Sequence, residues 1–187
     1  MISFYTFTSL FCYTSLMLTS DEEDFLRKIP DKIVRIFPFD PKATKIADEL
    51  MGKIKSACPS LEIVHMGASA LGISGQKDLD IYALADPKDF SKHTPKLIQL
   101  LGQPKIQRKD HVDWVFEEKG YQIEFYLTDP ESPTMKKQIA VFKILQGNEK
   151  LHREYEKLKE KFNRKFYKKY QKVKYEFYHR ILKPKAL

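Results

Sequence analysis

The chain is 187 residues long, with 42% hydrophobic and 13% aromatic residues. This length and composition fit one globular domain with a sizeable core, and they exclude an intrinsically disordered chain. The two cysteines, Cys12 and Cys58, are too few and too far apart for a disulfide framework or a structural zinc site. We therefore expect a reducing compartment, with the cytoplasm as the natural location.

Charge is distributed unevenly along the chain, whose formal net charge is +8. From Ser132 onward there are 17 Lys or Arg against 5 Glu, a net charge of +12, whereas the first 131 residues carry −4. Such asymmetry favours an anionic partner, such as a nucleotide or a nucleic acid. A solvated basic helix face is the alternative interpretation.

The N-terminal stretch Met1–Thr19 is apolar, rich in Ser and Thr, and free of charged side chains. A secretory signal would begin with positive charge, and Ser and Thr interrupt the apolar run that a membrane span needs. We therefore predict neither a signal nor a membrane association. We expect residues 1–16 to be dispensable, and an over-long translation start is one explanation for them.

The first part of the chain predicts two helices joined by an extended segment. A short helix begins at Ser20 or Asp21, and residues 33–37 form a strand or an extended segment. Asp40 and Pro41 take the N-cap and first helical positions of the second helix. Its apolar side chains recur on one face, at Ala43, Ile46, Ala47, Leu50 and Ile54.

Strands and one further helix are predicted between residues 61 and 127. Residues 61–66 form a strand, residues 86–101 form a helix, and residues 112–118 and 121–127 form a hairpin around Lys119-Gly120. Alternation along the last strand places Ile123, Phe125 and Leu127 on one face, with Gln122, Glu124 and Tyr126 on the other.

The remainder of the chain reads as helical, because it contains no proline between Pro133 and Pro184. Gly147-Asn148 divides a shorter helix, residues 135–146, from a long one, residues 149–182. Apolar residues recur along the long helix at three- or four-residue intervals, which predicts one amphipathic face against a core. They are Leu151, Tyr155, Leu158, Phe162, Phe166, Tyr170, Val173, Phe177 and Ile181.

The clearest chemical pattern in the sequence follows the predicted strand over residues 61–66. Gly67-x-Ser69 is followed by a glycine-spaced loop and then by Asp78-Leu79-Asp80. If the second run is a strand, Asp78 and Asp80 share one face with their Cα atoms roughly 7 Å apart. Two carboxylates at this spacing can converge on a hard cation and, through it, on phosphates. An exposed pair of strand acids without a metal is the alternative.

These residues resemble the nucleotidyltransferase superfamily of the DNA polymerase β type. The resemblance implies that Gly67 and Ser69 hold the nucleotide phosphates and that Asp78 and Asp80 bind divalent metal, Mg²⁺ or Mn²⁺. Glu124 is the best candidate for the third acid of the family. Asp113 on the neighbouring strand also alternates with apolar residues and remains open for that role. We interpret His65 as a packed, hydrogen-bonded residue rather than a base.

A closer resemblance, from about Val34 onward, is to the GrpB-like family of small nucleotidyltransferase-fold proteins. It is carried by Phe37-Pro38-Phe39-Asp40-Pro41, by His65-Met66-Gly67-Ala68-Ser69-Ala70, and by Tyr155-Glu156-Lys157-Leu158-Lys159 with Tyr170 and Lys174 further on. The chain departs from that family in carrying two acids, Asp78 and Asp80, and Gln122-Ile123-Glu124 on a later strand. Both departures bring the chain toward the catalytic pattern.

We predict an α/β (α+β) protein with a small mixed sheet flanked by helices and a long C-terminal helical hairpin. Residues 1–20 form an apolar segment, 21–131 the nucleotidyltransferase-like domain, and 132–187 a basic helical extension packed on the same domain. The resemblance implies metal-dependent transfer of NMP from an NTP to an acceptor. The alternatives are a non-catalytic nucleotide- or anion-binding protein, and an RNA-associated module that uses the basic C-terminal helix.

Overall fold

The protein is described by a computed structural model that covers residues 18–183. Residues 1–16 and Cys12, which the sequence analysis discusses, lie outside this part. A five-stranded sheet forms the centre, in the order β1-β2-β5-β4-β3, with β2 parallel to β5 and the other neighbours antiparallel. The strands are β1 (Glu62–Met66), β2 (Asp78–Leu84), β3 (Ile106–Gln107), β4 (His111–Glu118) and β5 (Tyr121–Thr128).

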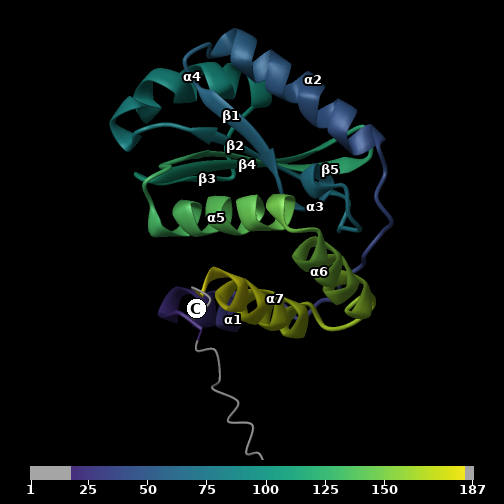
Figure 1. Cartoon of the computed structure of the whole chain (residues 1–187). Helices are drawn as coiled ribbons and strands as arrows, with labels where there is room; N and C mark the ends of the chain where they lie inside the picture. Colours follow the sequence, from purple (N-terminus) through teal and green to yellow (C-terminus); the bar gives the residue numbers. More distant parts are fainter. Residues whose placement is uncertain (1–17, 184–187) are drawn as a thin grey trace, which may run out of the picture.

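Helices cover both faces of this sheet. They are α1 (Ser20–Lys28), α2 (Lys42–Ala57), α3 (Gly67–Leu71), a short 3-10 turn η1 (Pro87–Asp89), α4 (Phe90–Leu101), α5 (Pro133–Gly147), α6 (Glu149–Lys161) and α7 (Tyr167–Leu182). Figure 1 shows α2 and α4 above the sheet, α5 below it, and α6, α7 and α1 beyond α5. The predicted mixed sheet flanked by helices is confirmed. None of the helices within residues 18–183 combines the length and the apolar character needed to cross a membrane.

The main core lies between the sheet and the helices α2 and α4. Leu79 and Ile81 of β2 and the predicted apolar face of β5 are fully buried there, against Leu50 and Ile54 of α2. Because side chains alternate along a strand, this arrangement sends the polar residues of β2 and β5 to the opposite face. Full burial of each large aliphatic side chain stabilises the fold by roughly 1.5–3 kcal/mol.

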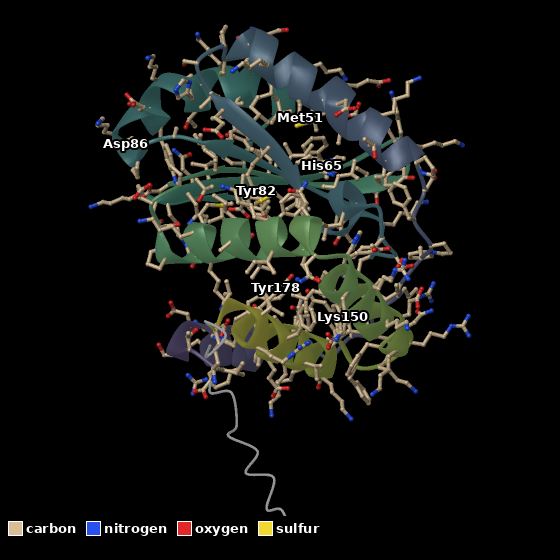
Figure 2. The ribbon with its side chains drawn as sticks, in the orientation of Figure 1. Met51, His65, Tyr82, Asp86, Lys150 and Tyr178 are labelled. Atoms are coloured by element: carbon tan, nitrogen blue, oxygen red, sulfur yellow. The ribbon has the colours of Figure 1, made fainter. Side chains whose placement is uncertain are left out.

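The opposite face of the sheet carries aromatic side chains that α5 covers. Tyr82 and Tyr126 stack with ring centroids 4.9 Å apart, and the Tyr82 hydroxyl donates to Oε1 of Gln138 at 2.9 Å. Figure 2 shows Tyr82 between the sheet and α5. Met66 and Met135 complete this second cluster. The same face continues along β2 and β5 to Asp80 and Glu124.

The prediction of one long C-terminal helix over residues 149–182 is wrong, because residues 162–166 separate α6 from α7. Arg164 adopts a left-handed conformation, with φ of 61°. Its N–H donates to the Val34 carbonyl at 2.8 Å, and the Val34 N–H donates to the Lys165 carbonyl at 2.9 Å. The break is therefore imposed by pairing with a distant segment. Phe166 leaves the predicted apolar stripe and is 62% exposed.

Glu22 joins α1 to the C-terminal helices through a buried carboxylate that is only 7% exposed. It accepts hydrogen bonds from His179 at 2.7 Å, from the Thr19 N–H at 2.9 Å, and from Lys137. Burial alone would raise the pKa of Glu22, but these hydrogen bonds outweigh it and hold the pKa at about 2. The ionised form is therefore the one that stabilises the fold.

We predict that Glu22→Gln lowers the free energy of unfolding at pH 7 by about 2–3 kcal/mol. The pKa is lower in the folded state than its ordinary value of 4.5. The contribution is therefore complete above about pH 4.5 and is lost as the pH falls toward 2. Urea titrations of wild type and variant from pH 7 to pH 2.5 measure it.

Glu23→Gln is the matched control, because it removes the same charge from an exposed position in the first turn of α1. It should change stability by less than about 0.5 kcal/mol. A Glu22→Gln deficit that stays constant between pH 7 and pH 2.5 would contradict the role given to the ionised carboxylate.

Candidate functional site

The three predicted acids lie on one face of two adjacent strands. Asp78 and Asp80 alternate with the buried Leu79 on β2, and the parallel register pairs Asp80 with Glu124 on β5. Asp113, the alternative third acid, pairs instead with Tyr126 from β4, one strand further from β2. The register therefore favours Glu124 over Asp113 as the partner of the β2 acids.

Acidic groups crowd together at this position, and crowding and burial disfavour their ionised forms. Burial, followed by the charges of Asp78 and Glu124, raises the pKa of Asp80 to about 8. Burial also raises the pKa of Asp78, with a smaller contribution in the same direction from Glu124. Within residues 18–183 none of the three acids takes part in a salt bridge. A cation would relieve this repulsion.

Glu124 is held in place by neighbours on its own strand. Its Oε2 accepts from the Tyr126 hydroxyl at 2.7 Å, and its Oε1 accepts from Nε2 of Gln122 at 2.6 Å. Burial raises the pKa of Tyr126, as does the charge of Glu124, so the phenol remains a donor at neutral pH. Asp78 has a weaker contact, with Nε2 of Gln76 at 3.5 Å from Oδ2.

Gly67 was predicted to hold phosphate, and the position of Asp80 also requires glycine there. Its φ is +75°, and a Cβ added to it would lie 2.0 Å from Oδ2 of Asp80. Only glycine allows both this backbone conformation and this approach. Ser69 lies two residues further into α3, where it is buried and its hydroxyl pairs with Nε2 of His65 at 2.9 Å. His65 is thus hydrogen-bonded, as we interpreted it.

The donor set fits a hard divalent cation in its chemistry. Carboxylate oxygens are the ligands that Mg²⁺ and Mn²⁺ prefer, and Asp78, Asp80 and Glu124 concentrate them on one surface. As the side chains stand, however, no group of three His, Cys, Asp or Glu within residues 18–183 converges closely enough to hold a metal. The carboxylates would therefore have to rotate toward an ion, and their assignment as ligands remains a prediction.

Two lysines of the C-terminal helices, not among the predicted site residues, act electrostatically on these acids. Lys159 of α6 is only 4% exposed, and Lys174 of α7 is partly buried. The charges of both lysines partly offset the rise in the pKa of Asp78 and Asp80, so they lie within electrostatic range of the acids. Neither forms an ion pair within residues 18–183. The acidic and basic groups are therefore separated.

Hydrogen bonds from α6 determine where Lys159 lies. Glu156 Oε1 accepts from the N–H of Ser74 at 3.0 Å and from its hydroxyl at 3.1 Å, which ties α6 to the loop before β2. The hydroxyls of Tyr155 and Tyr178 lie 2.9 Å apart and join α6 to α7. Figure 2 places Tyr178 in the layer between α5 and α7. Lys159 and Lys174 therefore lie on two helices, α6 and α7, that these hydrogen bonds hold in place.

Helical periodicity did not reveal these lysines, because lysines between apolar stripe positions are normally solvated. The sequence pointed to Lys159 and Lys174 only through the C-terminal motif of the GrpB resemblance, which includes both lysines. Burial of Lys159, with Lys174 close by, lowers the pKa of its ammonium group, and Asp78 raises it in part. A buried cation without a bonded partner is costly, which indicates a functional reason for its position.

The described residues form a five-stranded mixed sheet that is flanked by helices and carries the acid pair on β2. A family model described as GrpB protein matches residues 33–184, so the chain belongs to the GrpB family, as its motifs predicted. The crystal structure of conserved protein GrpB from Enterococcus faecalis is similar with a TM-score of 0.56 and 9% identity. The match covers 67% of this chain and 81% of that one.

Two structures of Cid1 also align with this chain. One, a poly(U) polymerase with bound MgGTP, gives a TM-score of 0.40 at 15% identity, covering 67% of this chain and 45% of that one. The other, described by its RNA terminal uridylyl transferase activity, gives 0.42 at 13% identity, covering 67% and 42%. Curated proteins give no significant match.

We predict that Gly67→Ala destabilises the protein by about 2–4 kcal/mol, because alanine at positive φ is strained and its Cβ would displace Asp80. Urea unfolding measures the loss. In an Asp80→Ala background the cost should fall by at least about 1 kcal/mol, since the displaced carboxylate is gone.

Gly52→Ala provides the matched control. Gly52 lies within α2 with nothing within 4 Å of an added Cβ, so alanine there should stabilise the protein by about 0.5–1 kcal/mol. An equal cost of Gly67→Ala with and without the Asp80 carboxylate would show that the two residues are not coupled.

Proposed function

We propose that this protein is a metal-dependent nucleotidyltransferase, which moves NMP from an NTP to an acceptor hydroxyl. The observation that carries the proposal is an acidic and a basic group of side chains that act on one another. Asp78, Asp80 and Glu124, the acidic wall, share one face of β2 and β5, and Lys159 and Lys174 of the C-terminal helices, the basic wall, lie within electrostatic range of Asp78 and Asp80. Membership of the GrpB family and the resemblance of Gly67-x-Ser69 and Asp78-Leu79-Asp80 to the nucleotidyltransferase pattern support the proposal.

Asp78 and Asp80 would hold Mg²⁺ or Mn²⁺, with Glu124 as the third ligand or as the base for the acceptor hydroxyl. The metal would supply activation of the attacking hydroxyl and neutralisation of the leaving pyrophosphate. Glu124 suits the role of base because its carboxylate is already oriented by Tyr126. Gly67 and Ser69 would hold the nucleotide phosphates, and glycine at position 67 also leaves room for the Asp80 carboxyl group.

The separation of acidic and basic side chains in the proposed site indicates which class of ligand would bind there. Carboxylates repel phosphate and lysines repel metal, so neither a free cation nor a free anion satisfies both walls. A metal-bound triphosphate presents positive charge to the acids and phosphate oxygens to Lys159 and Lys174. Ammonium groups bind phosphate oxygens through charge-assisted hydrogen bonds. The site is therefore complementary to a metal–nucleotide complex.

We predict that wild-type protein binds NTP in calorimetry only when Mg²⁺ or Mn²⁺ is present, and that Asp80→Asn removes this metal-dependent binding. Asp48→Asn, at an exposed position of α2, should bind like wild type. A pyrophosphate-release screen over the four NTPs and small or RNA acceptors tests transfer. Absence of both metal binding and pyrophosphate release in wild type would overturn the proposal.

The basic wall is tested in the same assay. Lys159→Gln and Lys174→Gln should each weaken Mg–NTP binding by about tenfold or more. Lys157→Gln and Lys172→Gln remove the same charge from exposed positions of the same two helices and should have little effect. Equal losses in all four variants would indicate general electrostatic attraction rather than contact with the phosphates.

A non-catalytic nucleotide sensor of the same fold is the first alternative. It shares the binding predictions but releases no pyrophosphate with any acceptor. Transfer of label from α-labelled NTP to protein, RNA or a small acceptor separates the two functions.

An RNA-binding role is the second candidate, and one specific observation favours it. A shallow pocket of about 430 Å³ at the start of α7 is lined by Phe166, Lys168, Lys169 and Lys172. An exposed aromatic ring beside cations is the arrangement that binds single-stranded nucleic acid, through base stacking and phosphate contacts. This surface lies on the C-terminal region with a net charge of +12.

We predict that, if this surface binds single-stranded RNA, log affinity falls linearly with log salt concentration. Lys168→Gln/Lys169→Gln should reduce the slope by about 1.4, at about 0.7 per phosphate contact. Fluorescence anisotropy from 50 to 300 mM salt measures the slope. Asp80→Asn should leave it unchanged, and an unchanged slope in the lysine variant would exclude this surface.

A further inference from the structure

We propose that a small aromatic pocket beside Asp78 and Ser69 is the subsite for the base of the nucleotide. The inference rests on the proposed function, because it assigns the part of the NTP that the acids and lysines do not hold. It also gives a role to the Phe37–Asp40 segment, which precedes α2.

The pocket lies where the segment before α2, the helix α3 and the loop before β2 meet the starts of strands β2 and β5. Its volume is about 210 Å³, and its walls include Phe37, Phe39, Tyr121, Ser69 and Asp78. Sites for whole drug-sized ligands occupy about 300–1,000 Å³, so this pocket fits one ring system rather than a whole nucleotide. Asp78 and Ser69 belong to both the pocket and the site of the acids, which makes the two continuous.

The walls present aromatic rings that the fold holds in place. Phe37 is 43% exposed although its backbone is fixed, since its N–H and carbonyl pair with Gly75 at 2.8 and 3.0 Å. The Tyr121 hydroxyl donates to Oδ2 of Asp40 at 2.6 Å. A preorganised exposed ring loses little conformational entropy on stacking against a flat ligand.

Lys77 adds a cation to the rim of the pocket at a cost in backbone strain. It adopts a left-handed conformation with φ of 67°, which is unusual for a residue other than glycine. Its Nζ lies 5.4 Å from the centroid of the Tyr121 ring. Strained residues persist where the surrounding structure requires them, often at ligand sites. Here the strain keeps a positive charge beside the aromatic wall and next to Asp78.

Three polar groups of the pocket, on Asp40, Tyr121 and Ser69, are already hydrogen-bonded within the protein, and Asp78 is assigned to the metal, which limits how the pocket would recognise a base. Asp40 accepts from Tyr121 and, through Oδ1, from the Lys42 N–H at 3.0 Å. The Ser69 hydroxyl is paired with His65. Recognition therefore rests on stacking rather than on hydrogen bonds to base edges. Because every base offers an aromatic face, the pocket should discriminate weakly among the four NTPs.

The test compares Mg²⁺ complexes of ATP, GTP, CTP and UTP with the Mg²⁺ complex of inorganic tripolyphosphate, using the full chain in calorimetry. Wild type should bind the four NTPs within about fivefold of one another and more tightly than tripolyphosphate. Phe37→Ala should weaken NTP binding by about tenfold and leave tripolyphosphate binding unchanged. Phe39→Leu, which keeps apolar volume and removes the ring, should act in the same direction if Phe37→Ala impairs folding.

Phe25→Ala removes an exposed aromatic ring from α1 and serves as the control, with no change expected. Equal wild-type affinity for NTP and tripolyphosphate, or variants that weaken neither, would overturn the base subsite while leaving the proposed function in place. A preference of more than about a hundredfold for one base would overturn recognition by stacking. Failure of wild type to bind either complex would instead overturn the proposed function.

Discussion

The parallel pairing of β2 with β5 is the constraint on which the rest of this protein depends. One register aligns Asp80 with Glu124 and, one residue later, Ile81 with Phe125. A slip of one residue would send the carboxylates into the core beneath α2 and α4, where each unpaired charge would cost several kcal/mol. The aliphatic core and the acidic surface are therefore two results of a single register, and neither can change without the other.

The same arrangement places several features at the site that lower the stability of the fold. Carboxylic acids crowd together, Asp80 occupies the space that a side chain at position 67 would need, and Lys159 is buried with no ionic partner within residues 18–183. None of these features stabilises the fold, and each resembles the local strain that proteins retain at functional sites. A protein selected for stability alone would replace them, so their coexistence at one place is an argument for a ligand that resolves all of them.

Many of the strands and the faces of their side chains could be predicted from local sequence patterns. Alternation along residues 121–127 correctly assigned both faces of β5, because the side-chain period of a strand is independent of tertiary context. Alternation also placed Asp78 and Asp80 on one face, whereas Glu124 was selected from the family resemblance and its pairing with Asp80 is known only from the register. Lys159 could not be found in this way, since its burial depends on how α6 docks through Glu156 and Ser74. The break at Arg164 was equally hidden, because its cause is a distant backbone segment.

The distance in sequence between the two sides of the site has a consequence for biosynthesis. Ile36 is hydrogen-bonded to Oδ1 of Asn163 at 3.0 Å across a separation of 127 residues. Contacts that close so long a loop form late in folding, because the chain loses conformational entropy on closing the loop before favourable contacts can compensate. A chain emerging from the ribosome carries its acids long before α6 and α7 exist. Such a nascent chain holds Asp78, Asp80 and Glu124 without Lys159 and Lys174, so the proposed site is completed only after α6 and α7 have been synthesised.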